Sequence, residues 1–286
     1  MPSFEIPEVD FSEYSNRQLV GPPLALLALA LSVLGVWYVL YGTPVDLGIA
    51  FTGGTELVVR ASASQETIRQ AFQAPVASVQ PIRTQADTYI VTFQSTNQQA
   101  LVNQAQQAGF EIVSVQSTSA TFGAGAQQTA LVGLGIAFLG MSLVVFGLFR
   151  TFVPSLAVVV SAFGDIVVPV ALMNVFDIPL TLGTVAALLM LIGYSVDSDI
   201  LLTNHVLRRS GSFYESVERA MRTGVTMTVT SISAMTVMAI VATLFGVDLL
   251  ASIGLVLVFG LVTDLVNTYM LNLSLLRWYK YEGVAR

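Results

Sequence analysis

Long apolar segments constrain this chain more than any other feature of its sequence. Hydrophobic residues make up 54% of it and charged residues only 10%, whereas an ordinary soluble domain carries about 25% charged residues. Each apolar segment has about the 20 residues that a helix needs to cross a bilayer. We therefore predict an α-helical, multi-pass membrane protein. The six predicted spans are 19–41, 128–149, 153–173, 180–203, 224–245 and 249–276.

The segment 42–127, between the first two spans, differs from the rest. It is rich in Gln, Ser and Thr and contains no spanning run. Tyr89, Val91 and Phe93 alternate with polar residues, which indicates a half-buried strand. The pattern predicts a small α+β domain in βαββαβ order, typical of a ferredoxin-like fold. Its expected strands are 56–61, 76–83, 88–94 and 110–117, and its expected helices are 64–72 and 97–108.

The distribution of Arg and Lys predicts the orientation of the spans. One set of short loops and tails holds nine of the twelve Arg and Lys residues, whereas the short loops near Asp177 and Asp248 hold none. By the positive-inside rule, both termini are cytoplasmic and 42–127 is extracytoplasmic. The tails 1–18 and 277–286 and the loop 204–223 are then cytoplasmic. The residues that set this orientation are Arg17, Arg150, Arg208, Arg209, Arg219, Arg222, Arg277, Lys280 and Arg286; Arg83 lies with Arg60 and Arg69 in the long segment, which the rule does not count.

Composition also excludes several kinds of site. The chain has no cysteine and one histidine, His205, which excludes disulfides, thiolate metal sites and histidine metal clusters. It has no phosphate-binding loop and no basic patch, so neither a nucleotide nor a nucleic acid is an expected partner. The net charge is −6 and Lys280 is the only lysine. This balance is typical of a high-salt source, with plain codon bias as the alternative.

Four aspartates lie inside the predicted spans, namely Asp165, Asp197, Asp199 and Asp264. A carboxylate removed from water is costly unless it is paired, solvated or protonated. Intramembrane acids therefore commonly mark ion pathways; the alternatives are water-exposed helix ends or packing contacts. Asp165 lies about 18 Å along its span and Asp264 is similarly deep, at about 1.5 Å per residue. These two are the least interfacial of the four.

Asp197 and Asp199 point to different sides of the fourth span, because two residues correspond to about 200° around a helix. Asp197 shares a face with Gly193, and Asp199 shares one with Ser195. One acid can face the bundle centre while the other faces a partner subunit or the cytoplasmic mouth. Because the third and fourth spans are joined by a short loop, we expect them to be antiparallel neighbours. We expect Asp165 and Asp197 to form the coupled pair.

The start of the fifth span carries further candidates. Arg222 can pair with an acid of a proton relay, or can anchor the helix at the cytoplasmic interface. Thr226, Thr230 and Ser233 share one helix face. That face can line a wet path or form hydrogen bonds across helices.

Two motifs resemble those of the SecD/SecF family of the resistance–nodulation–division (RND) superfamily, particularly its archaeal members. Residues 193–199, Gly-Tyr-Ser-Val-Asp-Ser-Asp, resemble the fourth-span motif. Residues 48–55, Gly-Ile-Ala-Phe-Thr-Gly-Gly-Thr, resemble the signature that follows the first span. Residues 164–165 and 222–223 resemble the third-span acid and the opening of the fifth span. The motif residues are Gly48, Phe51, Gly53, Gly54, Thr55, Gly193, Tyr194 and Ser195.

The chain departs from the family pattern at several positions. Ala50 replaces the aspartate of the signature. Bacterial members place their fourth-span acid at the position of Ser198, whereas related RND proteins place one at the position of Asp197. Asp264 has no counterpart in the bacterial pattern. The sequence therefore leaves open which aspartates form the relay and whether the coupling ion is H⁺ or Na⁺.

The resemblance implies an RND-like half bundle of six helices with one extracytoplasmic domain. It implies an accessory subunit of Sec protein export that acts with a SecD-like subunit and the SecY channel on a translocating preprotein. The energy would come from the membrane ion gradient, with no cofactor, no resident metal and no enzymatic activity. Two alternatives remain: an RND-type half-transporter for a lipid or small molecule, and a passive structural subunit of the translocon.

Overall fold

The computed structural model describes residues 11–82, 85–208 and 212–283, apart from the side chain of Arg208. Parts of the expected tails and of the expected loop 204–223 lie outside the described residues. So do three of the basic residues considered above, Arg83, Arg209 and Arg286.

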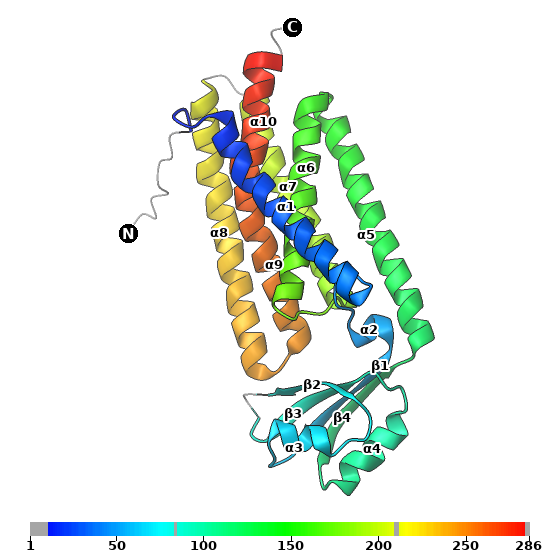
Figure 1. The fold of residues 1–286 in the computed structure, drawn as a ribbon. Helices are drawn as coiled ribbons and strands as arrows, with labels where there is room; N and C mark the ends of the chain where they lie inside the picture. The colour runs from blue at the N-terminus through cyan, green and yellow to red at the C-terminus, as the bar shows by residue number, and fades with distance from the viewer. Residues whose placement is uncertain (1–10, 83–84, 209–211, 284–286) are drawn as a thin grey trace, which may run out of the picture.

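Six helices in the described parts of the chain are long and apolar enough to cross a membrane. The predicted multi-pass architecture is confirmed. Figure 1 shows them as one bundle, with the small sheet projecting from one end, which we call the sheet end. The third, fourth and sixth of these helices are the most buried and form its centre. The first five are α1 (Asn16–Tyr41), α5 (Ala120–Phe149), α6 (Phe152–Val175), α7 (Leu182–Arg208) and α8 (Phe213–Phe245).

The sixth span is not one regular helix. It begins as α9 (Asp248–Val266) and widens into a π-helix, η1 (Asn267–Asn272). It then continues as α10 (Leu273–Trp278) and ends in a second π-helical stretch, η2 (Tyr279–Gly283). The apolar pattern predicts a span here but contains no signal for the π-helix. Such stretches are rare and are found frequently at functional sites.

The segment 204–223, expected as a loop, is mostly helical, which corrects the sequence-based interpretation. α7 continues to Arg208, and α8 begins at Phe213. Ser212 caps α8 through a capping box with Glu215, which satisfies backbone N–H groups that a helix start leaves unpaired. Phe213 is buried in a cluster with Val206 of α7. The helices therefore extend beyond the apolar runs because capping and packing stabilise their polar ends.

The segment between α1 and α5 contains a four-stranded antiparallel sheet in the order β2-β3-β1-β4. With two helices in βαββαβ order, this is the predicted ferredoxin-like arrangement. We call residues 54–118 the sheet domain. It ends earlier than expected, because Ser119 caps α5 and the helix begins at Ala120. Its elements are β1 (Gly54–Arg60), α3 (Gln65–Gln70), β2 (Val76–Pro81), β3 (Thr88–Phe93), α4 (Gln98–Gln107) and β4 (Glu111–Thr118).

A short helix, α2 (Ile49–Thr52), joins the sheet domain to the bundle. The backbone N–H of Gly48 donates to the carbonyl of Leu180 at 2.9 Å, which ties this segment to the start of the fourth span. Phe51 is buried against the bundle core. The link between the two regions is thus fixed at its base and is not a free linker.

The turn between α8 and α9 also touches the sheet domain. A Cβ atom on Gly246 would lie 2.5 Å from Cγ2 of Ile82, so the two residues are in close contact. Glu56 of β1 and Asp248 of α9 are near enough for their charges to interact. We call these four residues the junction. It places a half-buried carboxylate between the sheet and the sheet end of the bundle.

Candidate functional site

The centre of the bundle is polar where α6, α7 and the sixth span meet. Three aspartates lie there with hydroxyl and amide side chains around them, all at most 3% exposed. Burial of this kind is costly unless each group is hydrogen-bonded. The buried polar residues of this cluster are Ser161, Asp165, Ser195, Asp199, Thr203, Asp264, Asn267, Thr268 and Asn272.

Asp165 of α6 joins all three elements. Its Oδ2 atom accepts a hydrogen bond from Ser195 Oγ of α7 at 2.5 Å. Its Oδ1 atom accepts one from Asn267 Nδ2 of η1 at 2.7 Å. A Cβ atom on Gly164 would lie 2.7 Å from that amide nitrogen, so only glycine leaves Asn267 room to reach the carboxylate.

Asp199 and Asp264 are linked by one hydroxyl group. Thr268 Oγ1 lies 2.7 Å from Asp199 Oδ1 and 3.2 Å from Asp264 Oδ1. A hydroxyl carries one hydrogen, so Thr268 can donate to only one carboxylate at a time. Ser198 Oγ also lies 2.8 Å from Asp264 Oδ1, and Asn272 Nδ2 donates to Asp199 Oδ1 at 2.8 Å. The arrangement therefore has two hydrogen-bonding states: Thr268 donates to Asp199 in one and to Asp264 in the other.

The cluster lacks a compensating positive charge among its described hydrogen-bond partners. Those partners are serine, threonine and asparagine side chains. Three ionised carboxylates in one low-dielectric interior would repel one another and lose their hydration. A proton or another small cation must therefore offset part of the charge.

The structure corrects the expected pairing of Asp165 with Asp197. Asp199 is buried in the cluster, whereas Asp197 is exposed on the side of the bundle with Gly193. The spacing correctly separates the two acids into different faces. It does not fix the rotation of α7, which is set by packing: Ser195 bonds Asp165 and shares the buried face of Asp199.

Arg222 lies apart from the buried acids. Its guanidinium contacts Glu218 of the same helix at 2.9 Å, and both side chains are about half exposed. The hydroxyls of Thr226, Thr230 and Ser233 are largely exposed and donate to carbonyls one turn earlier in α8. They neither line the cluster nor bond to another helix in the described contacts.

The family-motif residues have two different roles. Ser195 enters the cluster, but Gly193 and Tyr194 are exposed. The signature glycines shape the link to the sheet domain. Gly53 and Gly54 have positive φ values of 78° and 148°. Their Cβ atoms would lie 2.6 Å from the backbone nitrogen of Ala120 and 2.4 Å from the carbonyl oxygen of Phe93, respectively. Larger residues are therefore excluded there.

Thr55 follows these glycines and is fully buried at the start of β1. Its hydroxyl lies 3.0 Å from that of Ser117 in β4. The signature after the first span thus positions the sheet domain and contributes no side chain to the carboxylate cluster.

Sequence reasoning missed the amide and hydroxyl partners on the sixth span. Asn267 and Asn272 do not stand out in the sequence, because neutral polar residues are tolerated in apolar spans. A signal was present, however: Asp264, Thr268 and Asn272 recur at intervals of four, which places them on one helix face. Their common face is the one that meets α7.

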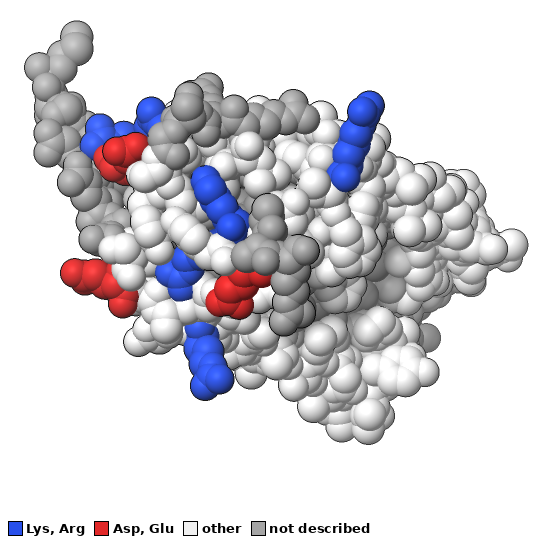
Figure 2. Space-filling model, turned by 90° about the horizontal axis from the view of Figure 1, so that it is seen from above, with Lys and Arg blue, Asp and Glu red and all other residues white. Residues whose placement is uncertain are grey.

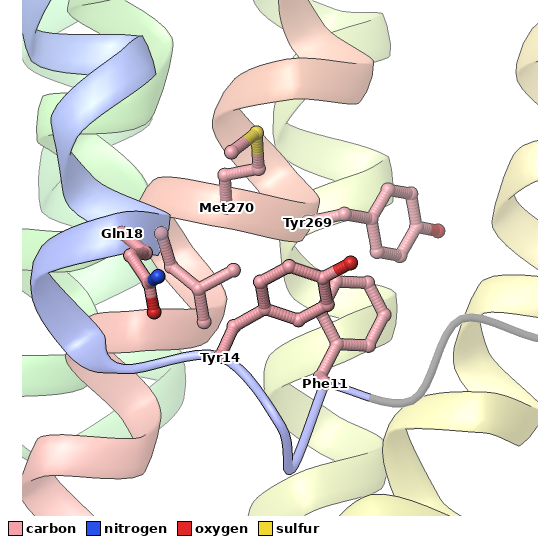
Figure 3. Close-up of a pocket in the computed structure, with 6 residues that line it drawn as sticks. Phe11, Tyr14, Gln18, Tyr269 and Met270 are labelled. Atoms are coloured by element: carbon pink, nitrogen blue, oxygen red, sulfur yellow. The ribbon is translucent and has the colours of Figure 1, made fainter.

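A separate cavity of about 460 Å³ lies between the segment before α1, the first turn of α1 and η1 (Figure 3). The start of α1 is at the end of the bundle opposite the sheet (Figure 1). The segment before α1 covers it, and η1 contributes two of its residues. Its lining is mainly aromatic and apolar and contains no carboxylate, so it is distinct from the cluster. The lining residues are Phe11, Tyr14, Gln18, Leu19, Tyr269 and Met270.

Solved structures contain a similar fold. The crystal structure of SecDF, a translocon-associated membrane protein from Thermus thermophilus, matches 96% of this chain with a TM-score of 0.71 and 20% sequence identity. The match covers 39% of the SecDF chain. At this identity, the likeness describes the fold alone.

Sequence comparison gives the family. The model for the protein export membrane protein SecD/SecF, C-terminal, matches residues 97–282. The protein-export membrane protein SecF of Haloferax volcanii is 62% identical over the full length of both chains, and that of Haloquadratum walsbyi is 64% identical, also over both full lengths. The SecF of Methanolacinia petrolearia is 40% identical over 96% of this chain and 97% of its own length. This chain belongs to the SecD/SecF family of protein export membrane proteins.

Proposed function

We propose that this chain is an accessory subunit of Sec protein export, paired with a SecD-like membrane subunit. In this role it promotes the passage of preproteins through the SecY channel and draws on the ion gradient across the membrane. Family membership supports the export role. The half-transporter alternative is not favoured, because the curated relatives are protein-export proteins. The observation that carries the coupling is the cluster of three buried aspartates.

The cluster offers a physical route from ion binding to movement. When a cation reaches or leaves the carboxylates, the charge shared by Asp199 and Asp264 changes, and Thr268 changes the acid to which it donates. Because these residues lie on α7 and the sixth span, the switch favours a different alignment of those two helices. α7 is tied to the base of the sheet domain through Leu180 and Gly48, and α9 touches it at the junction. A shift in the bundle thus reaches the sheet domain, which we propose binds or guides the emerging preprotein.

Asp197 supports the need for a second subunit. An acid exposed on the side of a membrane bundle is costly against lipid. A SecD-like subunit packed on this face of α7 would remove Asp197 from lipid and offer it a polar or basic partner. We therefore expect Asp197→Asn to weaken association with that subunit more than it affects the buried cluster.

Basic residues support an orientation with both termini in the cytoplasm. The described ones near the end opposite the sheet include Arg17, Arg150 and Arg277. Figure 2 views the bundle from that end and shows several blue side chains on it. By the positive-inside rule, this end is cytoplasmic and the sheet domain is extracytoplasmic. The chain has no cysteine, so Glu13→Cys and Thr96→Cys provide unique labels. An impermeant thiol reagent should reach them from opposite sides, and labelling of both from one side would refute the orientation.

The coupling is tested in vesicles that contain this chain, a SecD-like subunit and the export channel. We expect Asp199→Asn, Asp165→Asn and Asp264→Asn each to abolish the gradient-dependent part of preprotein export. Asp177→Asn is the matched control, because Asp177 is exposed in a loop at φ 53°, a conformation that asparagine also adopts. Normal gradient-dependent export by Asp199→Asn at normal abundance would refute the relay. It would favour the passive structural role.

A further inference from the structure

Four buried oxygen atoms on one side of the carboxylate cluster have incomplete hydrogen bonding. Thr203 Oγ1 and Asn272 Oδ1 lack a partner. Asp199 Oδ2 and Ser161 Oγ have no partner of good geometry, although the Ser161 hydroxyl interacts with the Asp199 carboxylate. All four side chains are 0% exposed, and a buried polar atom without a partner costs about 1–3 kcal/mol. Four such oxygens in one region indicate that the site is shaped for a ligand.

The helix directions bring these four residues to the same level. Asp199 lies one turn after Ser195 along α7, and Ser161 lies one turn before Asp165 along α6. Because Ser195 and Asp165 are hydrogen-bonded and the two helices are antiparallel, both steps lead toward the end opposite the sheet. A helical turn is about 5.4 Å. Ser161 and Asp199 therefore lie side by side, on the side of Asp165 that faces away from the sheet.

The remaining two oxygens extend the same group. Thr203 follows Asp199 by one turn on the same buried face of α7. Asn272 donates its amide Nδ2 to Asp199 Oδ1 at 2.8 Å, which holds the amide beside that carboxylate. Its Oδ1 atom is then left for another ligand. Asn272 also ends the π-helix η1, and irregular helices in membranes often supply groups that bind coupling ions.

The chemistry of these atoms selects the ligand class. They are all oxygens, which favours a hard cation over a soft one. Only one of the four residues carries a charge. Within the described residues, no group of three or more Asp, Glu, His or Cys side chains is arranged to hold a metal ion, so a divalent site is not indicated. A single carboxylate with neutral oxygens matches one monovalent cation.

We propose that Ser161, Asp199, Thr203 and Asn272 form a binding site for a sodium ion. The inference rests on the proposed function and identifies the ion that its cluster binds. Sodium fits better than potassium because it is the smaller ion and the four side chains that would bind it are fully buried between helices. A sodium ion at this position neutralises the charge of Asp199 and is bound by the four oxygens. The Thr268 hydroxyl can then donate its hydrogen bond to Asp264 instead of Asp199.

The first test uses the purified full chain in detergent. Thermal unfolding is followed in NaCl, KCl and choline chloride at equal total salt, and binding of radioactive ²²Na⁺ is measured directly. A ligand that binds only the folded state raises the melting temperature, and the rise continues with the logarithm of its concentration above Kd. We expect a stabilisation by Na⁺ that K⁺ and choline do not reproduce, and saturable binding of ²²Na⁺. Equal stabilisation by all three salts, without ²²Na⁺ binding, would overturn the site.

Two conservative variants test the residues. Thr203→Val and Ser161→Ala each remove one oxygen, and we expect each to weaken ²²Na⁺ binding at least tenfold. The matched control is Thr228→Val, because Thr228 is also buried in a span but its hydroxyl is bonded to the carbonyl of Gly224. It should bind ²²Na⁺ as the natural chain does. Unchanged binding by both Thr203→Val and Ser161→Ala would overturn the assignment.

The export assay separates this inference from the proposed function. If Asp199→Asn abolishes gradient-dependent export but no variant or salt shows specific Na⁺ binding, the relay stands and the sodium site is wrong. If specific Na⁺ binding is lost in Thr203→Val while Asp199→Asn exports normally, the sodium site stands and the coupling role is wrong.

Discussion

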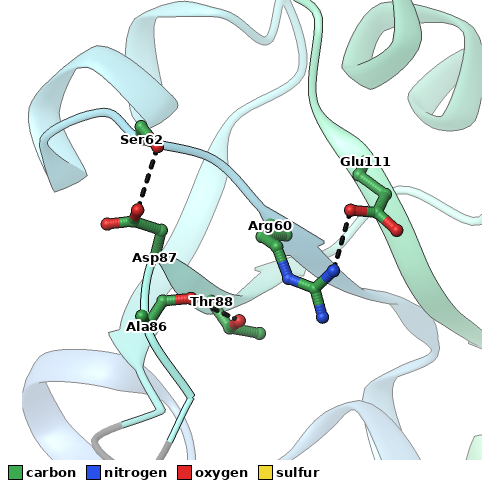
Figure 4. A network of polar contacts seen from close by, with 6 residues as sticks. All are labelled: Arg60, Ser62, Ala86, Asp87, Thr88 and Glu111. Atoms are coloured by element: carbon green, nitrogen blue, oxygen red, sulfur yellow. Dashed lines mark hydrogen bonds and ion pairs between the residues drawn. The ribbon is translucent and has the colours of Figure 1, made fainter.

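The sheet domain and the membrane bundle distribute polar groups in opposite ways. The core of the sheet domain is apolar, with Leu57, Val91 and Phe93 fully buried. Its charges lie outside in contacts such as Arg60 with Glu111 (Figure 4). The bundle buries its three aspartates and exposes apolar residues, for example Leu143 at 74%.

This difference follows from the surroundings of the two regions. Water drives apolar side chains into the core of the sheet domain. Lipid is as apolar as leucine, so helices in a bilayer gain little from burying apolar surface against one another. Polar contacts then contribute both specificity and function in the bundle. A buried carboxylate would thus destabilise the core of the sheet domain, whereas it contributes specificity and function in the interior of the bundle.

The largest expected effect comes from placing a carboxylate in the wrong interior. Val91→Asp buries an unpaired charge in the sheet domain and should reduce its stability by about 4 kcal/mol or more. Val113→Asp is the matched control, because Val113 is 47% exposed on β4, and it should cost about 1 kcal/mol or less. Hydrogen exchange of the β-strand amides in the full chain measures both. Equal protection in the two variants would contradict an apolar core at Val91.

Removal of a carboxylate from the bundle should have a smaller effect on stability. Asp165→Asn keeps the shape of the side chain, but its amide presents N–H groups near the donors of Ser195 and Asn267. We expect a loss of about 1–2 kcal/mol, measured by thermal unfolding of the purified chain. A loss as large as that of Val91→Asp would show that the aspartates mainly hold the bundle together, and the contrast between the two interiors would fail.

The sequence predicts the sheet domain well because its signals are local. Tyr89, Val91 and Phe93 alternate, and β3 occupies Thr88–Phe93, one residue shorter than the expected strand 88–94. The order of elements along the chain is also as predicted, and the strands pair in the order β2-β3-β1-β4. The C-terminal limit of the domain was misplaced because the start of α5 at Ala120 depends on the cap at Ser119. The polar residues Gln127 and Gln128 separate that first turn from the long apolar run of the span.

The candidate site is only partly predictable, because it depends on how helices rotate against one another. Depth alone identifies Asp165 and Asp264, since both lie far inside apolar runs. The choice between Asp197 and Asp199 requires the rotation of α7, which long-range contacts with α6 and the sixth span determine. The π-helix Asn267–Asn272 has no sequence signal. The neutral polar side chains of this π-helix can be recognised as site residues only from their hydrogen bonds to the aspartates in the structure.

The junction is a boundary between the two regions and should respond to pH. Burial raises the pKa of Glu56 above its ordinary value of 4.5, and the charge of Asp248 raises it further. A raised pKa in the folded state means that protonated Glu56 favours the closed contact. The contact is then most stable below pH 4.5, and its stability decreases as pH rises through the raised value.

Hydrogen exchange at residues 244–250, corrected for intrinsic rates, tests this response. Protection should be greater at pH 4 than at pH 7 in the natural chain, and Glu56→Gln should remove most of the difference. The effect should be modest because Glu56 is only half-buried. An unchanged pH dependence in Glu56→Gln would assign the response to another group.

The smallest effect is expected at the surface of the sheet domain, where Arg60 and Glu111 face each other across β1 and β4 at 2.9 Å. Their side chains are 49% and 65% exposed, so water screens the attraction and the coupling should be below about 1 kcal/mol. The double-mutant cycle of Arg60→Gln and Glu111→Gln isolates it, with strand protection measured at low and high salt. Coupling should fall as salt rises. A large coupling that salt does not reduce would mean that the Glu111 carboxylate is shielded from water like the aspartates of the bundle. The contrast between surface charges in the sheet domain and buried charges in the bundle would then fail.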